Sequence, residues 1–257
     1  MTEWKLVPAR DLGLAAGERL RSIHRETGWI EAIFHDLWGL LVRAYLGICH
    51  RLNIIGSRHL PLRPPFVLVA NHASHLDALA LAAMVPWRLR DKVFPLAAGD
   101  TFFEKGPMAA FAALLLNALP VRRRRPDLRE FETLRVRLTE DPCAFILFPE
   151  GTRSRTGRMG PFQRGIGRLV AGTRVPVLPC FLRGPFEAAP PRCRFPRFRR
   201  ITLVVGAPLS FESVDDSREG WSRIAGEVES AVRRLGATEQ SCSVAPEVPT
   251  TAPAPGR

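Results

Sequence analysis

The feature of this chain that most constrains its fold is a series of short apolar runs separated by segments with helical periodicity. Short apolar runs between turn residues are typical of buried strands, and apolar residues repeated every three or four positions are typical of helices packed on one face. Regular alternation of the two patterns indicates an α/β domain. We therefore expect a mixed, mostly parallel sheet flanked by helices, preceded by an N-terminal amphipathic helical segment.

The same patterns predict where these elements lie. Strands are predicted at 66–70, 93–98, 118–122, 144–148, 177–182 and 201–205. Helices are predicted near 78–85, 102–115, 126–139, 163–172 and 217–235. With 257 residues, the chain is long enough for one such domain with appendages. We assign 1–55 to the amphipathic segment, 56–236 to the α/β domain and 237–257, which is rich in Ala, Pro, Thr, Ser and Val, to a disordered tail.

The N-terminal segment is amphipathic rather than uniformly apolar. Between Trp29 and Ile55, apolar residues recur at helical spacing, but charged residues such as Asp36 and Arg43 interrupt them. No run therefore approaches the roughly twenty apolar residues of a membrane span. Such a helix can pack on a protein core or lie in a membrane interface. The start of the chain lacks the apolar core of a secretory signal, so we expect the protein to remain inside the cell.

A candidate acid/base pair follows the first predicted strand. His72 and Asp77 stand in the run Asn-His-Ala-Ser-His-Leu-Asp, with four residues between them. A neutral imidazole can take a proton from a hydroxyl group when a carboxylate holds its other ring nitrogen. Five positions of an unbroken helix turn through about 140°, which would point the two side chains apart. We therefore expect a turn at His72 and a helix whose first turn contains Asp77, although helix capping alone would also account for Asp77.

A second motif lies at the end of the strand predicted at 144–148. It reads Phe-Pro-Glu-Gly-Thr-Arg-Ser over residues 148–154. Together with the Asn-His-x4-Asp run, it resembles the third and first sequence blocks of the glycerolipid acyltransferases, a family typified by 1-acylglycerol-3-phosphate acyltransferase. The prolines of Val-Pro-Val-Leu-Pro-Cys over 175–180 match the fourth block, and Phe-Gln-Arg-Gly over 162–165 resembles the step before it. The second block fits less well, because Arg123 matches its basic residue but the leading glycine is missing.

The resemblance covers about residues 50–210, so the α/β domain is expected to be an acyltransferase domain. It implies transfer of an acyl group from a thioester to the hydroxyl group of a lysophosphatidic-acid-like lipid, which gives phosphatidic acid. His72 would be the general base and Asp77 would orient it, with direct attack and no acyl-enzyme intermediate. A base of this kind typically contributes about 10²- to 10⁴-fold in rate.

The resemblance also implies which residues contact the substrate. These are Arg123, Glu150, Gly151, Thr152, Arg153 and Pro179. A guanidinium group can hold a phosphate through two hydrogen bonds, and a glycine allows close approach of the backbone, so Gly151 and Arg153 suit a phosphate. Glu150 could either position Arg153 or accept a hydrogen bond from the glycerol moiety.

The charge of the chain indicates anionic partners. Lys and Arg total 37 against 25 Asp and Glu, a formal net charge of +12. This excess would attract phospholipid headgroups, coenzyme A phosphates, an acidic acyl carrier protein and nucleic acid alike. The resemblance implies an acyl-CoA or acyl carrier protein thioester as co-substrate, a lysophospholipid acceptor and an anionic membrane surface, with no nucleic acid and no bound cofactor. We accordingly expect a peripheral or monotopic protein on the cytoplasmic side of the membrane.

Several alternatives stay open at this point. The acceptor could be glycerol 3-phosphate, a lyso-ornithine lipid or another lysophospholipid, or the chain could be a non-catalytic basic lipid-binding protein. His72, His75 and Asp77 could be metal ligands, although no histidine follows them to complete a typical zinc site, and we predict no metal. The absence of Gly-x-Ser-x-Gly argues against a serine hydrolase, and no nucleotide-binding glycine loop is present.

Overall fold

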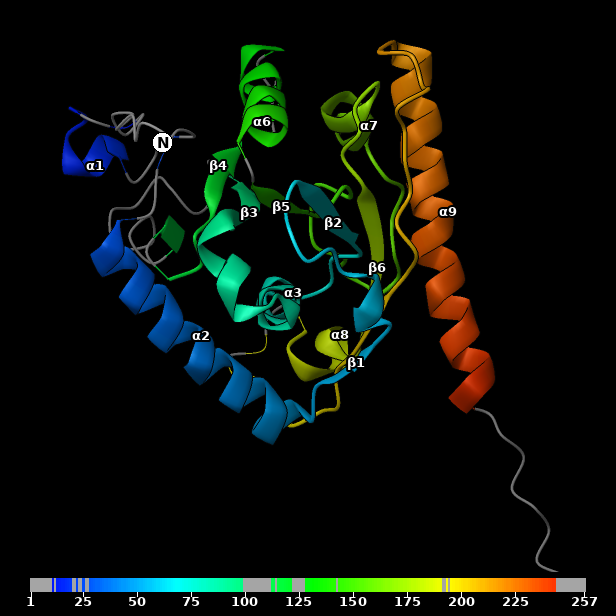
Figure 1. Cartoon of the computed structure of the whole chain (residues 1–257). Helices are drawn as coiled ribbons and strands as arrows, with labels where there is room; N and C mark the ends of the chain where they lie inside the picture. Colours follow the sequence, from blue (N-terminus) through cyan, green and yellow to red (C-terminus); the bar gives the residue numbers. More distant parts are fainter. Residues whose placement is uncertain are drawn as a thin grey trace, which may run out of the picture.

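The structure, a computed structural model, describes residues 28–98, 115–121, 128–141, 143–190 and 195–243, together with residues 11, 13–19, 22, 25, 112, 113 and 193. Within these residues, one sheet has the strand order β1-β7-β6-β2-β5-β3-β4 (Figure 1). The strands are β1 (Asn53–Ile55), β2 (Phe66–Ala70), β3 (Val93–Ala98), β4 (Leu119–Val121), β5 (Ala144–Leu147), β6 (Val177–Arg183) and β7 (Thr202–Val205). Neighbouring strands are parallel except β6 and β7, which confirms the mixed, mostly parallel sheet.

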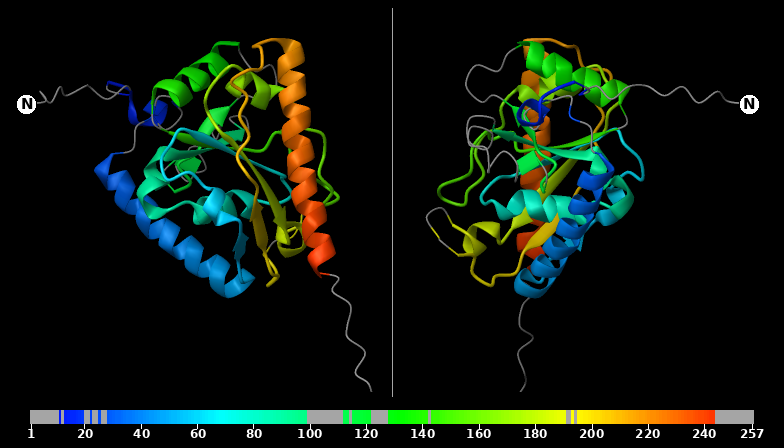
Figure 2. Two further views of the ribbon diagram at one scale, coloured as in Figure 1. Left: turned by 45° about the vertical axis from the view of Figure 1, so that its right-hand side comes forward. Right: turned by 90° about the vertical axis from the view of Figure 1, so that its left-hand side faces the viewer.

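Helices cover both faces of this sheet. They are α1 (Ala16–Arg19), α2 (Trp29–His50), α3 (Leu76–Met84), α6 (Leu128–Glu140), α7 (Gly165–Val170), α8 (Pro185–Ala188) and α9 (Arg218–Ser243), with 3₁₀ turns η1 (Ser57–His59) and η2 (Trp87–Lys92). The side chains of α2 and α3 pack on one face, and those of α6, α7 and α9 pack on the other (Figure 2). The central strand β2 is consequently buried at every position, as its uninterrupted apolar sequence requires.

The strand predictions are confirmed within one residue, but the edge strand β1 was missed. It lies inside the stretch from Trp29 to Ile55 that we assigned to one helix, and that assignment is wrong after His50. Arg51 has a positive φ of 45°, which ends the helix, and the N–H of Leu52 bonds back to the carbonyl of Leu46 at 3.1 Å. The chain then pairs in parallel with β7, so the sheet takes in the last residues of the predicted amphipathic segment.

The last helix extends beyond the residue at which we placed the start of the tail. The helix α9 continues through Ala237 to Ser243, where Ala, Glu and Gln favour a helix even without an apolar stripe. Residues 244–257 lie outside the described residues, as does most of the helix predicted at 102–115. The other predicted helices are found, and the division into three parts stays a prediction.

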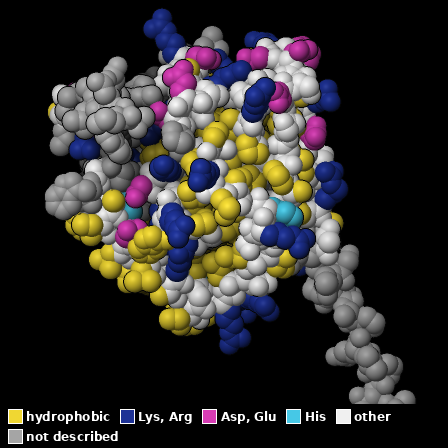
Figure 3. All heavy atoms as spheres, viewed as in Figure 1, with side chains coloured by type: hydrophobic (Ala, Val, Ile, Leu, Met, Phe, Trp, Pro, Cys, Tyr) yellow, Lys and Arg dark blue, Asp and Glu magenta, His cyan; other side chains and the backbone are white. Residues whose placement is uncertain are grey.

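The helix α2 presents apolar side chains to both the core and the exterior. Val42 and Leu46 are buried against the sheet side, while the outer surface exposes six large apolar residues, Ile33, Phe34, Leu37, Leu40, Leu41 and Ile48. Figure 3 shows hydrophobic side chains gathered over α2 and over the middle of the same face. The window Ala32–His50 is long and apolar enough to cross a membrane, and most of it is unburied. Our expectation that no segment is apolar enough to cross a membrane is therefore corrected. This stretch contains the charged residues Asp36 and Arg43, but its mean hydropathy stays high enough despite them.

Candidate active site

The turn between β2 and α3 is fixed to the neighbouring strand by Asn71. Its side-chain amide donates to the carbonyl of Leu182 at 3.0 Å, and its side-chain oxygen accepts the N–H of the same residue at 2.8 Å. Asn71 is buried, so both hydrogen bonds form away from water. The next residue, His72, therefore leaves the carboxyl end of β2 from a fixed point. Ligands of open α/β sheets commonly bind at this edge.

The carboxylate of Asp77 organises the turn. One of its oxygens, Oδ2, accepts the backbone N–H of Ala73 at 2.6 Å and that of Ser74 at 2.8 Å, and it also bonds Nδ1 of His72 at 2.8 Å. The side chain of Asp77 is 0% exposed. The sequence left two interpretations of Asp77 open, helix capping and an acid/base pair. The structure shows the contacts of both, because the same buried oxygen binds the backbone N–H groups of the turn and the imidazole of His72.

This arrangement selects one tautomer of the neutral His72 ring. Since the Asp77 carboxylate can only accept at Oδ2, Nδ1 of His72 is the donor, and in the neutral imidazole Nε2 then has the lone pair. Nε2 makes no hydrogen bond to any described residue, and the side chain is 14% exposed. The ring stacks on Phe148 with 4.1 Å between the ring centroids and 18° between the planes. The His72 ring is thus held by Asp77 at Nδ1 and by Phe148 at one face, and in its neutral form it can accept a proton at Nε2.

The Phe-Pro-Glu-Gly-Thr-Arg-Ser motif holds the backbone of the same histidine. Oε1 of Glu150 accepts the N–H of His72 at 2.7 Å, and the N–H of Ser154 donates to the carbonyl of His72 at 2.8 Å. The other oxygen of Glu150 accepts the N–H of Gly160 at 2.8 Å. Because β2 and β5 are neighbours, the two motifs form one unit. Glu150 therefore positions His72 in this structure, a role that neither of our sequence hypotheses contained.

Burial gives Glu150 an unusual electrostatic setting. Its exposed fraction is 9%, and loss of water raises the pKa of its carboxyl group, while the N–H groups of Gly160 and His72 act in the opposite direction. A carboxylate with two separate acceptor oxygens is needed to satisfy both N–H groups at once.

Replacing Glu150 by Gln is expected to lower kcat by about ten- to hundredfold with little change in KM, because a neutral amide offers one oxygen and leaves one N–H facing an NH₂ group, which displaces His72. Steady-state kinetics of the purified variant would measure this. Glu227→Gln, the same change on the exposed surface of α9, serves as the control. An unaltered kcat for Glu150→Gln would remove the positioning role.

The remaining residues predicted to contact substrate fall into different settings. Gly151 has a φ of 71°, and a Cβ there would lie 2.5 Å from the side chain of Gln163, so local geometry alone requires glycine. Thr152 and Arg153 are exposed beside it. Pro179 is buried within β6, opposite Val69 of β2. Arg123 lies outside the described residues, and contact of these residues with substrate stays a prediction.

His75 lies in the same turn, but the hydrogen bonds of Asp77 described above go to His72, Ala73 and Ser74. Removal from water, and after it the positive charge of Arg153, lowers its pKa. Within the described part of the chain, no group of three or more His, Cys, Asp or Glu side chains could hold a metal ion.

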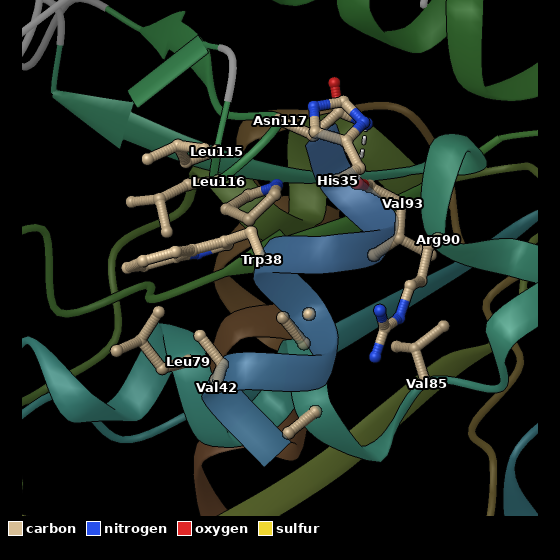
Figure 4. Close-up of a pocket in the computed structure, with 14 residues that line it drawn as sticks. His35, Trp38, Val42, Leu79, Val85, Arg90, Val93, Leu115, Leu116 and Asn117 are labelled. Atoms are coloured by element: carbon tan, nitrogen blue, oxygen red, sulfur yellow. Dashed lines mark hydrogen bonds between the residues drawn. The ribbon is translucent and has the colours of Figure 1, made fainter. Parts of the chain in front are cut away.

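An apolar pocket lies beneath α2, next to the helix that carries Asp77. Its empty volume is about 530 Å³, part of it open to solvent, and neither His72 nor Asp77 lines it. In Figure 4, Trp38 of α2 lies between Leu116 and Leu79 of α3. Most of the lining is aliphatic or aromatic, which suits an apolar ligand.

The fold and the site together define an α/β domain with a hydrogen-bonded His–Asp pair at the carboxyl end of a strand. A family model described as Acyltransferase matches residues 51–183 of the 257, and the chain belongs to this family. The resemblance drawn from the sequence motifs is therefore confirmed.

Individual relatives have related names. The chain is 33% identical over 169 residues to 1-acyl-sn-glycerol-3-phosphate acyltransferase alpha of Mus musculus, which covers 64% of this chain and 56% of the relative. It is 30% identical over 147 residues to 1-acyl-sn-glycerol-3-phosphate acyltransferase BAT2, chloroplastic, of Brassica napus, covering 55% and 40%. The chain thus spans about half the length of these relatives.

A solved structure has the same fold. The crystal structure of the 1-acyl-sn-glycerophosphate (LPA) acyltransferase PlsC from Thermotoga maritima superposes with a TM-score of 0.61 and 23% identity. The match covers 81% of this chain and 79% of that one. At this identity the likeness establishes the fold, a mixed sheet flanked by helices.

Proposed function

We propose that this protein transfers an acyl group from a thioester to the hydroxyl group of a lysophosphatidic-acid-like glycerolipid and so forms phosphatidic acid. The observation that carries the proposal is the His72–Asp77 hydrogen bond of 2.8 Å, while Nε2 of His72 bonds to none of the residues that the structure describes. Nε2 takes the proton of the acceptor hydroxyl as its oxygen attacks the thioester carbonyl. The tetrahedral intermediate then collapses, the C–S bond breaks, and the imidazolium returns the proton to the leaving thiolate. Asp77 stabilises the positive charge that His72 carries between these steps.

The acceptor in this proposal carries a phosphate group near its hydroxyl. Arg153 is exposed, and the N–H of the next residue, Ser154, donates to the carbonyl of His72 at 2.8 Å, so a phosphate bound by Arg153 would lie near the base. Thr152 and the backbone at Gly151 would add hydrogen bonds, and Arg123 is proposed as a second phosphate contact. The names of the relatives support lysophosphatidic acid as the acceptor. The proposed reaction uses no bound cofactor and no metal.

The donor is proposed to be acyl-CoA or an acyl carrier protein thioester. Both are strongly anionic, which matches the net charge of +12. The apolar pocket between α2 and α3 would accept part of an acyl chain, since its lining is mostly aliphatic and it opens beside the helix of Asp77.

One assay tests acceptor and donor together. Purified wild-type protein on anionic vesicles is incubated with radiolabelled lysophosphatidic acid and either acyl-CoA or acyl carrier protein thioester, with His72→Ala in parallel. Phosphatidic acid that forms only with wild type supports the reaction and identifies the donor. If no product forms with either donor, glycerol 3-phosphate, a lyso-ornithine lipid and other lysophospholipids are tested as acceptors. Absence of product with all of these acceptors would contradict acyl transfer and favour a binding protein.

The protein is further proposed to associate with the cytoplasmic side of a membrane through α2. This helix packs on the domain through Val42 and Leu46, and Arg43 is tied to the carbonyl groups of Ala83 and Val85. A helix fixed along one side to the domain, with an apolar opposite side, suits a position in the membrane interface better than a crossing. A lipid substrate held in the bilayer would then meet the domain at this surface.

Replacing both Leu37 and Leu41 by Ser is expected to weaken binding to phospholipid vesicles by about tenfold or more, because two exposed leucines of one helix side lose their apolar area. Cosedimentation with vesicles measures the binding. Val136→Ser changes an exposed apolar residue on α6, on the other side of the sheet, and should have no effect. Equal binding by the double variant and wild type would contradict the proposed role of α2.

A further inference from the structure

A loop between α8 and β7 exposes every side chain from Phe195 to Arg200, although its backbone is anchored. The N–H of Arg197 donates to the carbonyl of Ala188 at 2.6 Å, which ties the 195–200 loop to α8. The carbonyl of Arg199 accepts a hydrogen bond of 3.0 Å from Nδ1 of His50, the last residue of α2. The side chains therefore project outward from a fixed backbone.

Two of these side chains are large and aromatic. Phe195 is 74% exposed and Phe198 is 78% exposed. Single exposed apolar residues are common on protein surfaces and need no explanation. Two phenylalanines three positions apart on one anchored loop form an apolar projection, and such projections indicate a surface that they enter.

Positive charge surrounds the two aromatic side chains. Arg197, Arg199 and Arg200 are exposed in the loop. Between Gly184 and Thr202 the sequence contains five arginines and one carboxylate. Apolar side chains interleaved with arginines suit an anionic interface, where the rings enter the apolar layer and the guanidinium groups stay among phosphates.

The loop lies next to the C-terminal end of α2, the helix with the exposed apolar side chains. His50 bonds directly to the loop, and Ile48, two residues before the end of α2, is 79% exposed. Figure 1 shows the chain after α8 beside the C-terminal end of α2. Arginine and phenylalanine would also suit single-stranded nucleic acid, but the six exposed apolar residues on α2 favour a lipid surface.

We propose that the 195–200 loop is a second membrane-binding element. Phe195 and Phe198 enter the interfacial layer, and Arg197, Arg199 and Arg200 bind the phosphate groups of anionic phospholipids. With α2, the loop gives the domain two contacts with the membrane, which fixes its orientation as well as its distance. This extends the proposed membrane association of α2 and is tested without substrate, so its failure is distinguishable from failure of the proposed reaction.

Cosedimentation of the full chain with vesicles tests the loop. Vesicles contain phosphatidylcholine alone, or equal parts of phosphatidylcholine and phosphatidylglycerol. The double variant Phe195→Ser, Phe198→Ser is expected to bind both vesicle types about tenfold or more weakly. The triple variant Arg197→Gln, Arg199→Gln, Arg200→Gln is expected to bind the anionic vesicles about a hundredfold more weakly, at about fivefold per arginine, and to bind phosphatidylcholine as wild type does.

A matched control separates the loop from net charge. Arg218→Gln, Arg223→Gln, Arg234→Gln removes the same charge from the exposed side of α9, on the opposite side of the sheet. Circular dichroism checks that each variant is folded. Vesicle binding by both loop variants equal to that of wild type would overturn the proposal. An equal loss in the loop and α9 triple variants would overturn the role of the loop arginines. Loss of nucleic-acid binding or of self-association, with vesicle binding retained, would assign the loop to another partner.

Discussion

Replacing His72 by Ala is expected to lower kcat for acyl transfer by about 10²- to 10⁴-fold, the usual contribution of a general base. In the proposed reaction Nε2 of His72 takes the proton of the acceptor hydroxyl, and without it the hydroxyl must attack while neutral. KM for the acceptor should change little, because the imidazole acts on the proton rather than on the phosphate. Initial rates at saturating thioester, measured by product formation, provide both constants.

His75→Ala is the matched control, since it removes an imidazole from the same turn. We expect its kcat to stay within about tenfold of wild type, as it lacks the bond to Asp77 that prepares a base. Equal losses in the two variants would instead suggest that both histidines act together, as metal ligands would. A His72→Ala variant with wild-type kcat would exclude the proposed mechanism.

The sequence predicted the central part of the site because the information there is local. Apolar residues up to Ala70 followed by a turn and a new helix could bring His72 and Asp77 together only in a strand–turn–helix, and the structure has this arrangement. The five other predicted strands were likewise evident from short apolar runs between turn residues.

The role of Glu150 could not be predicted, because it depends on strand order. Its carboxylate reaches the N–H of His72 only because β5 lies beside β2 in the sheet. The spacing of residues along the sequence does not reveal which strands are neighbours. The same limit applies to Asn71, whose bonds cross to Leu182 on β6. From the sequence alone, a carboxylate or amide side chain that binds the backbone of a distant strand cannot be distinguished from one that binds substrate or caps a helix.

The surface of α2 was unpredictable for a different reason. Apolar residues occupy both sides of this helix, so periodicity identifies the helix without showing which side is buried. Leu46 proves to be buried and Ile48 exposed, two residues apart and equally apolar. The strand β1 was missed because three residues are too few to establish an alternating pattern.

The second large effect is expected at Asp77, where two substitutions separate folding from chemistry. Asp77→Ala removes the acceptor for two buried backbone N–H groups, those of Ala73 and Ser74. Each unsatisfied group costs about 1–3 kcal/mol, so the free energy of unfolding should fall by about 2–6 kcal/mol. Urea denaturation measures this loss, which no change confined to chemistry would produce.

Asp77→Asn keeps an oxygen for the same N–H groups but removes the negative charge. It should lose less stability than Asp77→Ala, and its kcat should still fall by about 10²- to 10⁴-fold, because the imidazolium of His72 loses its counter-charge and the tautomer is no longer fixed. A folded Asp77→Asn enzyme with nearly full activity would show that Asp77 only caps the turn. Low activity with near-normal stability would show that one carboxylate oxygen serves the fold and the reaction through separate interactions.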